Sequence, residues 1–441
     1  MSRLATCLIA LASLLEAPLS FAQIPQESGR DTIDLAFRNF FAADSPTTAE
    51  HYITPILKTD VTFDDALRQL QQGRHYADQK TGVIQLSNRT ADGVEHTFTV
   101  NVPATYNPAR RYQVRFQLHG GIDDRSDGTP RGRGDIGTLA GAEQIYVLPY
   151  AWDRAPWWSD DQILNLNAII DSLKRTYNVD ENRVVLSGVS DGATGAYFIA
   201  MSDTTPFASF LPLNGFILVL SIHPEVEGRL FPNNLTNKPL FVVNGGKDPI
   251  YPSATVEPFT RHLMAGGVQI DYHPQPEGAH NTRWWPEVRD TYEKFVADHP
   301  RDPQPSRLTW EAADLAHNRA HWLIINAFGD IPGQAMKLPD INLMRGLNSE
   351  GVMFLRPIPT GRVDVARTGN TVEALTRGVS SFTLLLSPDS FDLKQPVKVI
   401  ANGREVFDGH VSPSVRTLLE WAARDNDRTM LYAAELTITL H

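Results

Sequence analysis

The stretch that decides the fold is residues 183–201, RVVLSGVSDGATGAYFIAM. An apolar run, Val184–Leu186, leads into Gly188-Val189-Ser190-Asp191-Gly192, and a segment rich in alanine and glycine follows. A G-x-S-x-G turn between a buried strand and a helix holds a serine at its tip in a strained backbone conformation. The two glycines are required where strand and helix approach too closely for a Cβ atom. We therefore interpret Ser190 as a nucleophile rather than as a solvated serine in an ordinary glycine-rich turn.

Two further chemical groups follow at the ends of later apolar runs. Residues 239–243 (PLFVV) are typical of a strand buried on both faces, and they end in a glycine-rich turn that carries Asp248. Residues 268–272 (VQIDY) predict another strand, which is followed by a loop with His280. The order Ser190, Asp248, His280 is the nucleophile–acid–base order of α/β-hydrolases. The sequence therefore predicts a catalytic triad in which His280 is the general base and Asp248 orients it.

A third motif precedes the serine. Residues 112–118 (YQVRFQL) predict a strand that runs directly into His119-Gly120-Gly121. Attack of a serine on a carbonyl group creates an oxyanion, which fixed N–H donors must stabilise. We expect one donor from Gly121 or Ile122 and the other from the N–H of Asp191, whose side chain should point away. The alternative is that these glycines only end the strand.

Together these motifs resemble the α/β-hydrolase superfamily over residues 82–299. The Ser190-Asp191-Gly192 elbow, the His119-Gly120-Gly121 loop and Ala279-His280-Asn281 are most similar to secreted esterases of the polyhydroxybutyrate-depolymerase, feruloyl-esterase and phospholipase/carboxylesterase type. The resemblance implies a mostly parallel sheet with helices on both faces and a serine acyl-enzyme mechanism acting on carboxylic esters. Asp191 stands where many such esterases carry a small or apolar residue, and no third glycine follows Gly121, so the substrate class stays open.

The fold class predicted from the pattern of elements is α/β. Apolar runs that alternate with helical stretches predict a doubly wound, mostly parallel sheet. Residues 81–102 alternate in polarity around an Asp-Gly turn, which predicts an antiparallel hairpin ahead of the parallel strands. The parallel strands are expected at residues 112–118, 144–148, 183–186, 210–220, 240–243 and 268–272. The helices between them are expected at residues 160–177, 253–265 and 286–298.

The remaining segments predict a chain of several parts. Residues 1–22 have the short positive region, apolar stretch and small-x-small site of a secretory signal peptide, so we expect a secreted or periplasmic protein. Residues 23–80 are expected to form an N-terminal helical cap, ahead of the catalytic domain at 81–299. The proline-rich segment 300–305 is interpreted as a linker. Residues 306–441 predict a β-rich accessory domain that resembles a β-sandwich.

Within that last region, short strand-like runs dominate. Helical pieces are expected only at residues 314–318 and 413–424, and Asn402-Gly403 predicts a hairpin turn. The domain could dock the enzyme to a polymer or cover an apolar face of the sheet. Trp310, Trp322 and Trp421 fall within predicted elements, where large aromatic side chains are usually core, and they favour the second role.

Composition limits the partners and cofactors of the protein. The 441 residues carry a formal net charge of −11, which argues against nucleic acid and anionic membrane surfaces as partners. Beyond the signal segment no apolar run is long enough to span a bilayer. The single cysteine, Cys7, lies in the signal segment, so disulfides are not expected. No residue group has metal-ligand spacing, so we expect no metal and no cofactor, and a small-molecule or polymeric ester as substrate. The oligomeric state stays open.

Tryptophans gather near the predicted catalytic loops. Trp157 and Trp158 follow one strand, and Trp284 follows His280. Aromatic platforms suit sugar rings, aryl acids and apolar polymers, so we expect these three side chains to contact substrate. The alternative is that they pack helices onto the sheet.

Two other functions remain open at this point. A serine aminopeptidase or peptidase of the prolyl-oligopeptidase-like type has the same triad order, although the residues before the hairpin are too few for the propeller that such enzymes carry. A polymer-binding protein could use the hydrolase domain only as a scaffold. An intact triad argues against that second alternative.

Overall fold

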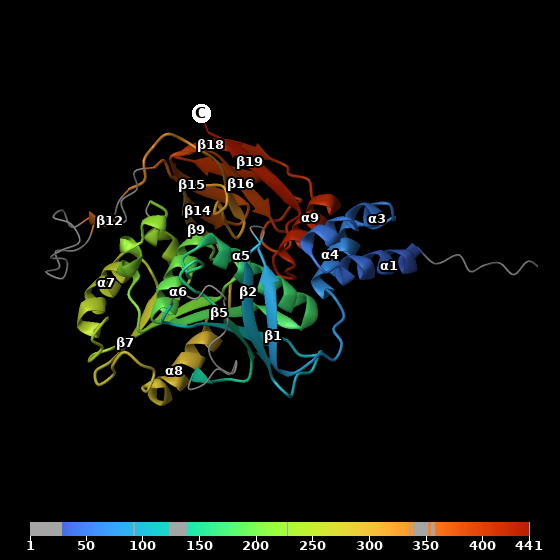
Figure 1. The fold of residues 1–441 in the computed structure, drawn as a ribbon. Helices are drawn as coiled ribbons and strands as arrows, with labels where there is room; N and C mark the ends of the chain where they lie inside the picture. Colours follow the sequence, from blue (N-terminus) through green and yellow to red (C-terminus); the bar gives the residue numbers. More distant parts are fainter. Residues whose placement is uncertain are drawn as a thin grey trace, which may run out of the picture.

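The computed structural model describes residues 29–90, 93–122, 139–226, 228–334, 336–337, 352–353 and 358–440, so the predicted signal peptide lies outside the described residues. Its central sheet has eight strands: β1 (Gly82–Arg89), β2 (Glu95–Val102), β3 (Tyr112–Leu118), β4 (Ile145–Pro149), β5 (Val179–Val189), β6 (Ser209–Leu213), β7 (Leu240–Gly245) and β8 (Ile270–Gln275). Their order is β1-β2-β4-β3-β5-β6-β7-β8 (Figure 1). The β1–β2 and β2–β4 pairs are antiparallel and the other pairs are parallel. The predicted hairpin and mostly parallel sheet are thus confirmed.

Four long helices flank this sheet: α5 (Asp160–Thr176), α6 (Asp191–Ser202), α7 (Ser253–Ala265) and α8 (Trp285–Asp298). They cover both faces, because alternate side chains of β7 enter two different apolar clusters. Leu240 and Val242 pack in the cluster that contains α5, α6 and α7, whereas Phe241 and Val243 pack in the cluster of α8. Every residue of β6 and β7 is buried, as expected of strands covered on both sides.

One predicted strand is shorter in the structure. The run expected at residues 210–220 is a strand only as far as Leu213. Asn214 then adopts a left-handed backbone with φ of 50°, which turns the chain out of the sheet. Ile217–Ile222 continues as a 3-10 helix, η2, with Ile217, Leu218 and Leu220 packed in the core. The apolar run is therefore genuine core, but periodicity alone does not distinguish strand from buried helix.

The helix predicted at residues 314–318 is also wrong. This described segment contains bends instead of helical turns. The Asp314 carboxylate accepts the N–H groups of Ala316 and His317, at 3.0 and 3.1 Å. Such local side-chain bonds compete with helix formation, which explains the difference.

Beyond residue 306 the chain forms two further sheets, built from β9 (Arg307–Ala312), β10 (Arg319–Ala320), β11 (Leu323–Phe328), β14 (Gly361–Thr368), β15 (Thr371–Arg377), β16 (Val379–Leu386), β17 (Val397–Ala401), β18 (Arg404–Gly409) and β19 (Ala434–Thr439). Their orders are β10-β11-β16-β19 and β18-β17-β15-β14-β9, and β12 (Met336–Lys337) with β13 (Val352–Met353) forms a separate pair. Trp310 and Val363 of one sheet share an apolar cluster with Ile325 and Phe382 of the other. The predicted β-sandwich-like arrangement is confirmed. The turn at Asn402-Gly403 joins β17 to β18 as predicted.

The N-terminal helices pack against the C-terminal region. They are α1 (Gly29–Ala42), α2 (Pro46–Glu50), α3 (Ile53–Leu57) and α4 (Phe63–Gln72), and they lie beside α9 (Val415–Asp425) in Figure 1. Leu418 and Leu419 of α9 share an apolar cluster with Phe37, Ile56 and Leu70. The predicted helix at residues 413–424 is thus present, and the first and last parts of the described chain form one packed unit.

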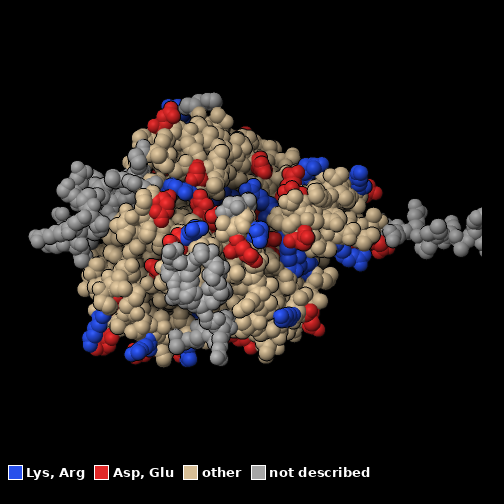
Figure 2. Space-filling model, in the orientation of Figure 1, with Lys and Arg blue, Asp and Glu red and all other residues tan. Residues whose placement is uncertain are grey.

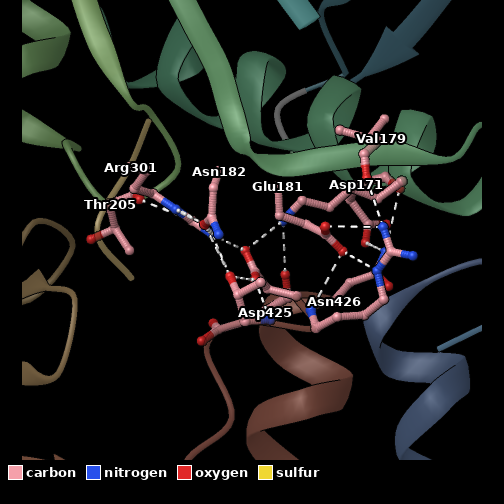
Figure 3. Close-up of polar contacts among 12 residues, drawn as sticks. Asp171, Val179, Glu181, Asn182, Thr205, Arg301, Asp425 and Asn426 are labelled. Carbon is pink, nitrogen blue, oxygen red and sulfur yellow. Dashed lines mark hydrogen bonds and ion pairs between the residues drawn. The ribbon is translucent and has the colours of Figure 1, made fainter. Parts of the chain in front are cut away.

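The segment predicted as a linker, residues 300–305, is anchored inside the molecule. Arg301 is only 3% exposed. Its guanidinium donates to Asn182 Oδ1 at 2.9 Å, to Thr205 O at 3.3 Å and to Asp427 Oδ2 at 2.8 Å (Figure 3). Prolines exclude a helix here, as the sequence predicts, but they do not require exposure to solvent. The segment predicted as a linker is therefore fixed to the rest of the molecule at Arg301.

Further ion pairs extend this junction along residues 425–429. Lys174 Nζ lies 3.3 Å from Asp427 Oδ2, and Arg428 donates to Glu181 Oε2 at 3.0 Å. Lys174 belongs to α5 and Glu181 to β5, so the loop after α9 is bound directly to the α/β sheet and its covering helix. Figure 3 shows Glu181 and Asn182 of β5 on one side of this junction and Asp425 and Asn426, at the end of α9, on the other.

Charged side chains are mixed in sign on the surface. On the face in Figure 2, basic and acidic groups alternate along the junction between the upper sheets and the α/β part. The described residues on this face show no large patch of a single sign. The formal net charge of −11 is therefore not concentrated there.

Candidate active site

Ser190 lies at the sharp turn between β5 and α6. Its φ of 56° and ψ of −118° are a strained combination for a residue with a side chain. Its N–H donates to Leu213 O at 3.0 Å, which ties the turn to β6. A Cβ atom at Gly188 would lie 2.1 Å from Gly192 O, and one at Gly192 would lie 2.3 Å from Leu118 O. Close approach therefore requires both glycines, as the sequence predicts.

The structure brings Ser190, Asp248 and His280 together. His280 Nε2 lies 2.9 Å from Ser190 Oγ, and His280 Nδ1 lies 2.7 Å from Asp248 Oδ2. The three residues follow β5, β7 and β8, whose carboxyl ends meet at one edge of the sheet. With the Nδ1 proton donated to Asp248, Nε2 is free to accept the proton of the serine hydroxyl. The arrangement can thus activate a serine oxygen.

The Asp248 carboxylate has hydrogen-bond partners on both of its oxygens. Its side chain is fully buried, and its Oδ1 atom accepts the N–H groups of Ile250 at 2.8 Å and Tyr251 at 2.9 Å. Oδ2 is left to His280. The turn after β7 therefore fixes the direction in which the carboxylate meets the imidazole.

Tyr251 is a neighbour of the site that the sequence analysis missed. Its ring stands edge-on to the His280 ring, with centroids 5.7 Å apart. Burial raises the pKa of the Tyr251 phenol, and the charges of Asp191 and Asp248 raise it further. The phenol is therefore neutral near pH 7, and its ring covers one side of the imidazole. Its place in the turn that carries Asp248 was the only sequence signal for it.

The loop after β3 approaches the serine closely. A Cβ atom at Gly120 would lie 2.7 Å from Ser190 Cβ, so only glycine fits there. Gly121 has a φ of 69°, a left-handed conformation that glycine adopts without strain. The loop thus does more than end a strand, because it brings backbone against the serine. The predicted role of the Gly121 N–H as an oxyanion donor stays a prediction.

The prediction for Ile122 is wrong, and so is the expected direction of the Asp191 side chain. Ile122 N–H donates to Asp191 Oδ2 at 2.9 Å. This N–H is therefore occupied, and the carboxylate turns back toward the loop instead of pointing away. Asp191 is the first residue of α6, so its own N–H has no acceptor inside the helix. Its backbone can still be the second predicted donor.

The three tryptophans predicted to contact substrate are buried, which contradicts that role. Trp157 is fully buried, and Trp158 and Trp284 are 7% and 5% exposed. Trp157 packs on Gly195 of α6, where the absence of a Cβ makes room for it. Trp158 stacks beside His223, and Trp284 belongs to the apolar cluster of α8. The alternative that these side chains pack helices onto the sheet is the one observed.

Trp157 instead supports the glycine loop. Its Nε1–H donates to His119 O at 2.8 Å. The His119 ring accepts the N–H of Ala151 at Nε2, at 3.1 Å. The residue just before Gly120 is therefore fixed by both its backbone and its side chain.

Metal-binding groups and membrane-spanning helices are both absent from the described part of the chain. Among those residues, no group of three or more His, Cys, Asp or Glu side chains could hold a metal ion. No described helix is both long and apolar enough to cross a membrane.

Comparison with known proteins gives matches among solved structures alone. No family model matches the chain, and neither does any curated protein. Similar structures include a thermostable esterase, 20% identical, covering 50% of this chain and 63% of that chain, slightly under two thirds of its length, with a TM-score of 0.41. A ferulic acid esterase is 16% identical and covers 49% of this chain and 98% of its own, with a TM-score of 0.39. Esterase 2 of Thermogutta terrifontis is 17% identical, with coverages of 50% and 96% and a TM-score of 0.39.

The fold is assigned from the order of the strands and the positions of the site residues in this chain. The eight-stranded order, the serine turn between β5 and α6, and the acid and histidine after β7 and β8 occur together in one sheet. In an α/β-hydrolase the nucleophile stands on a sharp strand-to-helix turn and the triad follows in the order serine, acid, histidine. The described residues of this chain therefore have the α/β-hydrolase fold.

Proposed function

We propose that this protein is a serine hydrolase that cleaves carboxylic esters through an acyl-enzyme intermediate. The observation that carries the proposal is the contact of His280 with both Ser190 Oγ and Asp248 Oδ2, at 2.9 and 2.7 Å. A hydroxyl, an imidazole and a carboxylate in this line are the groups that acyl transfer requires.

In the proposed first step, Ser190 Oγ forms a bond to the ester carbonyl carbon while its proton moves to His280 Nε2. The carbonyl oxygen becomes an oxyanion, stabilised by the N–H groups of Gly121 and Asp191. The C–O bond to the alcohol then breaks, and His280 returns the proton to the leaving oxygen. Water then attacks the carbonyl carbon of the acyl-enzyme while His280 takes its proton. The bond to Ser190 Oγ breaks, the proton returns to Oγ, and the carboxylic acid is released. The Asp248 carboxylate stabilises the imidazolium that forms in each half of the reaction.

Esters rather than amides are proposed because the motifs around the serine, the glycine loop and the histidine resemble those of secreted esterases. The same resemblance, with the signal-like residues 1–22, supports action outside the cytoplasm. No step of the proposed chemistry needs a cofactor.

The experiment is a substrate panel with a matched variant. Purified protein is assayed with p-nitrophenyl esters of increasing acyl length, with aryl esters and with aminoacyl p-nitroanilides. We expect ester turnover at least about a hundredfold above anilide turnover, and loss of about 10⁴-fold or more in Ser190→Ala. Anilide cleavage that matches ester cleavage would favour a peptidase, and full ester turnover by Ser190→Ala would reject the proposal.

A further inference from the structure

The glycine loop after β3 is held by hydrogen bonds at two points. Upstream of Gly120, His119 is bound through Trp157 and Ala151. Downstream, the N–H of Ile122 is bound by the carboxylate of Asp191 at 2.9 Å. Gly120, which lies between these anchors, is the residue of the loop that lies against the serine.

We propose that Asp191 is a positioning residue that locks the oxyanion loop onto the nucleophile turn. This inference rests on the proposed function, and it assigns to the Asp191 side chain a task separate from that of its backbone N–H. The carboxylate belongs to the residue next to Ser190, while its bonding partner lies 69 positions earlier in the sequence. This hydrogen bond therefore joins the turn that carries the serine to the loop that carries an oxyanion donor. It fixes the position of one group relative to the other.

The geometry of the loop explains why such a lock is needed. Gly120 and Gly121 lack side chains, and Gly121 has a positive φ, with no atom of the described residues within 4 Å of a Cβ built there. Glycine also loses more backbone entropy on ordering than any other residue. A charge-assisted bond to the next N–H along the chain is the direct way to order this segment.

The position of Asp191 suits that task. As the first residue of α6 it lies at the positive end of the helix dipole, which stabilises a carboxylate there. The sharp turn at Ser190 aims the start of α6 toward the loop after β3, since Gly192 lies against Leu118 O. The carboxylate therefore reaches the loop without leaving the helix terminus.

An oxyanion donor acts mainly in the transition state, so its positioning should affect kcat more than KM. Asp191→Ala removes the acceptor for Ile122 N–H and should lower kcat about 10- to 100-fold with KM changed less than about threefold. Asp191→Asn retains a side-chain oxygen and should restore most of the lost rate. A boronic acid, which forms a charged tetrahedral adduct with the serine, should lose affinity in Asp191→Ala by a factor similar to that in kcat.

Hydrogen–deuterium exchange gives a readout that does not depend on activity. The peptide that contains residues 116–122 should exchange faster in Asp191→Ala than in the wild-type protein, and Asp191→Asn should be intermediate. Asp64→Ala is the matched control, because it removes an exposed first-turn carboxylate from α4 and should change neither exchange nor kcat. If Asp191→Ala does not fold, Asp191→Ser replaces it, since its hydroxyl is too short to reach the loop.

The outcomes separate this inference from the proposed function. Unchanged kcat, boronic acid affinity and exchange in Asp191→Ala, with activity still abolished by Ser190→Ala, would overturn the positioning role alone. A rise in KM with kcat unchanged would also overturn it, because that result indicates substrate binding. Activity that survives Ser190→Ala would overturn the proposed function itself.

Discussion

Asp248 divides its two carboxylate oxygens between two tasks. Oδ1 accepts two backbone N–H groups of its own turn, and Oδ2 faces His280. The first set of bonds fixes the side chain, so the second can fix the imidazole. Replacement of Oδ2 by an amide nitrogen should therefore change the tautomer of the His280 ring. The turn after β7 should keep its conformation, because Oδ1 still accepts its two N–H groups.

We expect Asp248→Asn to lower kcat by about 10⁴-fold, because an amide nitrogen facing Nδ1 favours the wrong imidazole tautomer. The unfolding midpoint should change little, since Asn can still accept the N–H groups of Ile250 and Tyr251. Steady-state hydrolysis of a p-nitrophenyl ester and thermal unfolding measure the two effects. A fall in kcat of less than tenfold would contradict the assigned role.

The buried Trp157 side chain holds the residue that precedes the glycine loop, through its hydrogen bond to His119 O. We expect Trp157→Phe to remove the bond to His119 O and to destabilise the fold by about 1–3 kcal/mol, because a partly buried carbonyl loses its donor. KM should stay within about threefold, since the side chain is fully buried. Urea unfolding and steady-state kinetics separate the two effects. A large rise in KM at unchanged stability would restore the idea of a substrate platform.

At the scale of elements, the turn between β5 and α6 is the feature most sensitive to change. Its glycines let a strand, a helix and the end of β3 meet within a few ångströms of Ser190. Gly188→Ala would place a Cβ 2.1 Å from Gly192 O, so we expect a destabilisation of about 3 kcal/mol or more. Activity should be lost with it.

Gly329→Ala is a matched control for that substitution. Among the described residues, a Cβ atom there would meet no atom closer than 3.7 Å, so stability and activity should stay near wild type. Thermal unfolding of both variants tests the comparison. Equal unfolding midpoints for Gly188→Ala and Gly329→Ala would show that the serine turn can relax to accept a Cβ atom.

The elements also show what sequence could and could not predict. Strong periodicity and glycine spacing located the serine turn, the acid after β7 and the histidine after β8, because chain connectivity and strand ends determine their positions. The strand expected at 210–220 and the helix expected at 314–318 failed, since Asn214 and Asp314 alter the backbone through local conformation and bonding. The tryptophans were misassigned because closeness in sequence to a catalytic loop says nothing of which way a ring packs.

At the scale of the whole molecule, a buried ion cluster joins the C-terminal region to the α/β sheet. Burial alone would raise the pKa of Asp427, but the charges of Arg301 and Lys174 and hydrogen bonds from Arg301 and Thr429 outweigh it and lower the pKa. No sequence pattern marks such a cluster, because its members come from separate segments of the chain.

This cluster should make the protein sensitive to acid. The folded pKa of Asp427 lies below that of the unfolded chain, so its stabilisation is complete above about pH 4 and is lost as the pH falls further. Asp427→Asn leaves two buried cations without their carboxylate and should cost about 3–5 kcal/mol at pH 7. Its stability should also fall less steeply between about pH 4 and pH 2 than that of the wild type. Urea unfolding across this range checks both expectations, and identical pH profiles would contradict them.

The central claim is that Ser190 is the nucleophile that forms the acyl-enzyme. The most direct measurement is peptide mass mapping after treatment with a fluorophosphonate, which bonds covalently to an activated serine. We expect one adduct, on Ser190, that forms in the wild-type protein and is absent from Ser190→Ala. An adduct on another residue, or no adduct in a protein that still hydrolyses esters, would show that Ser190 is not the nucleophile.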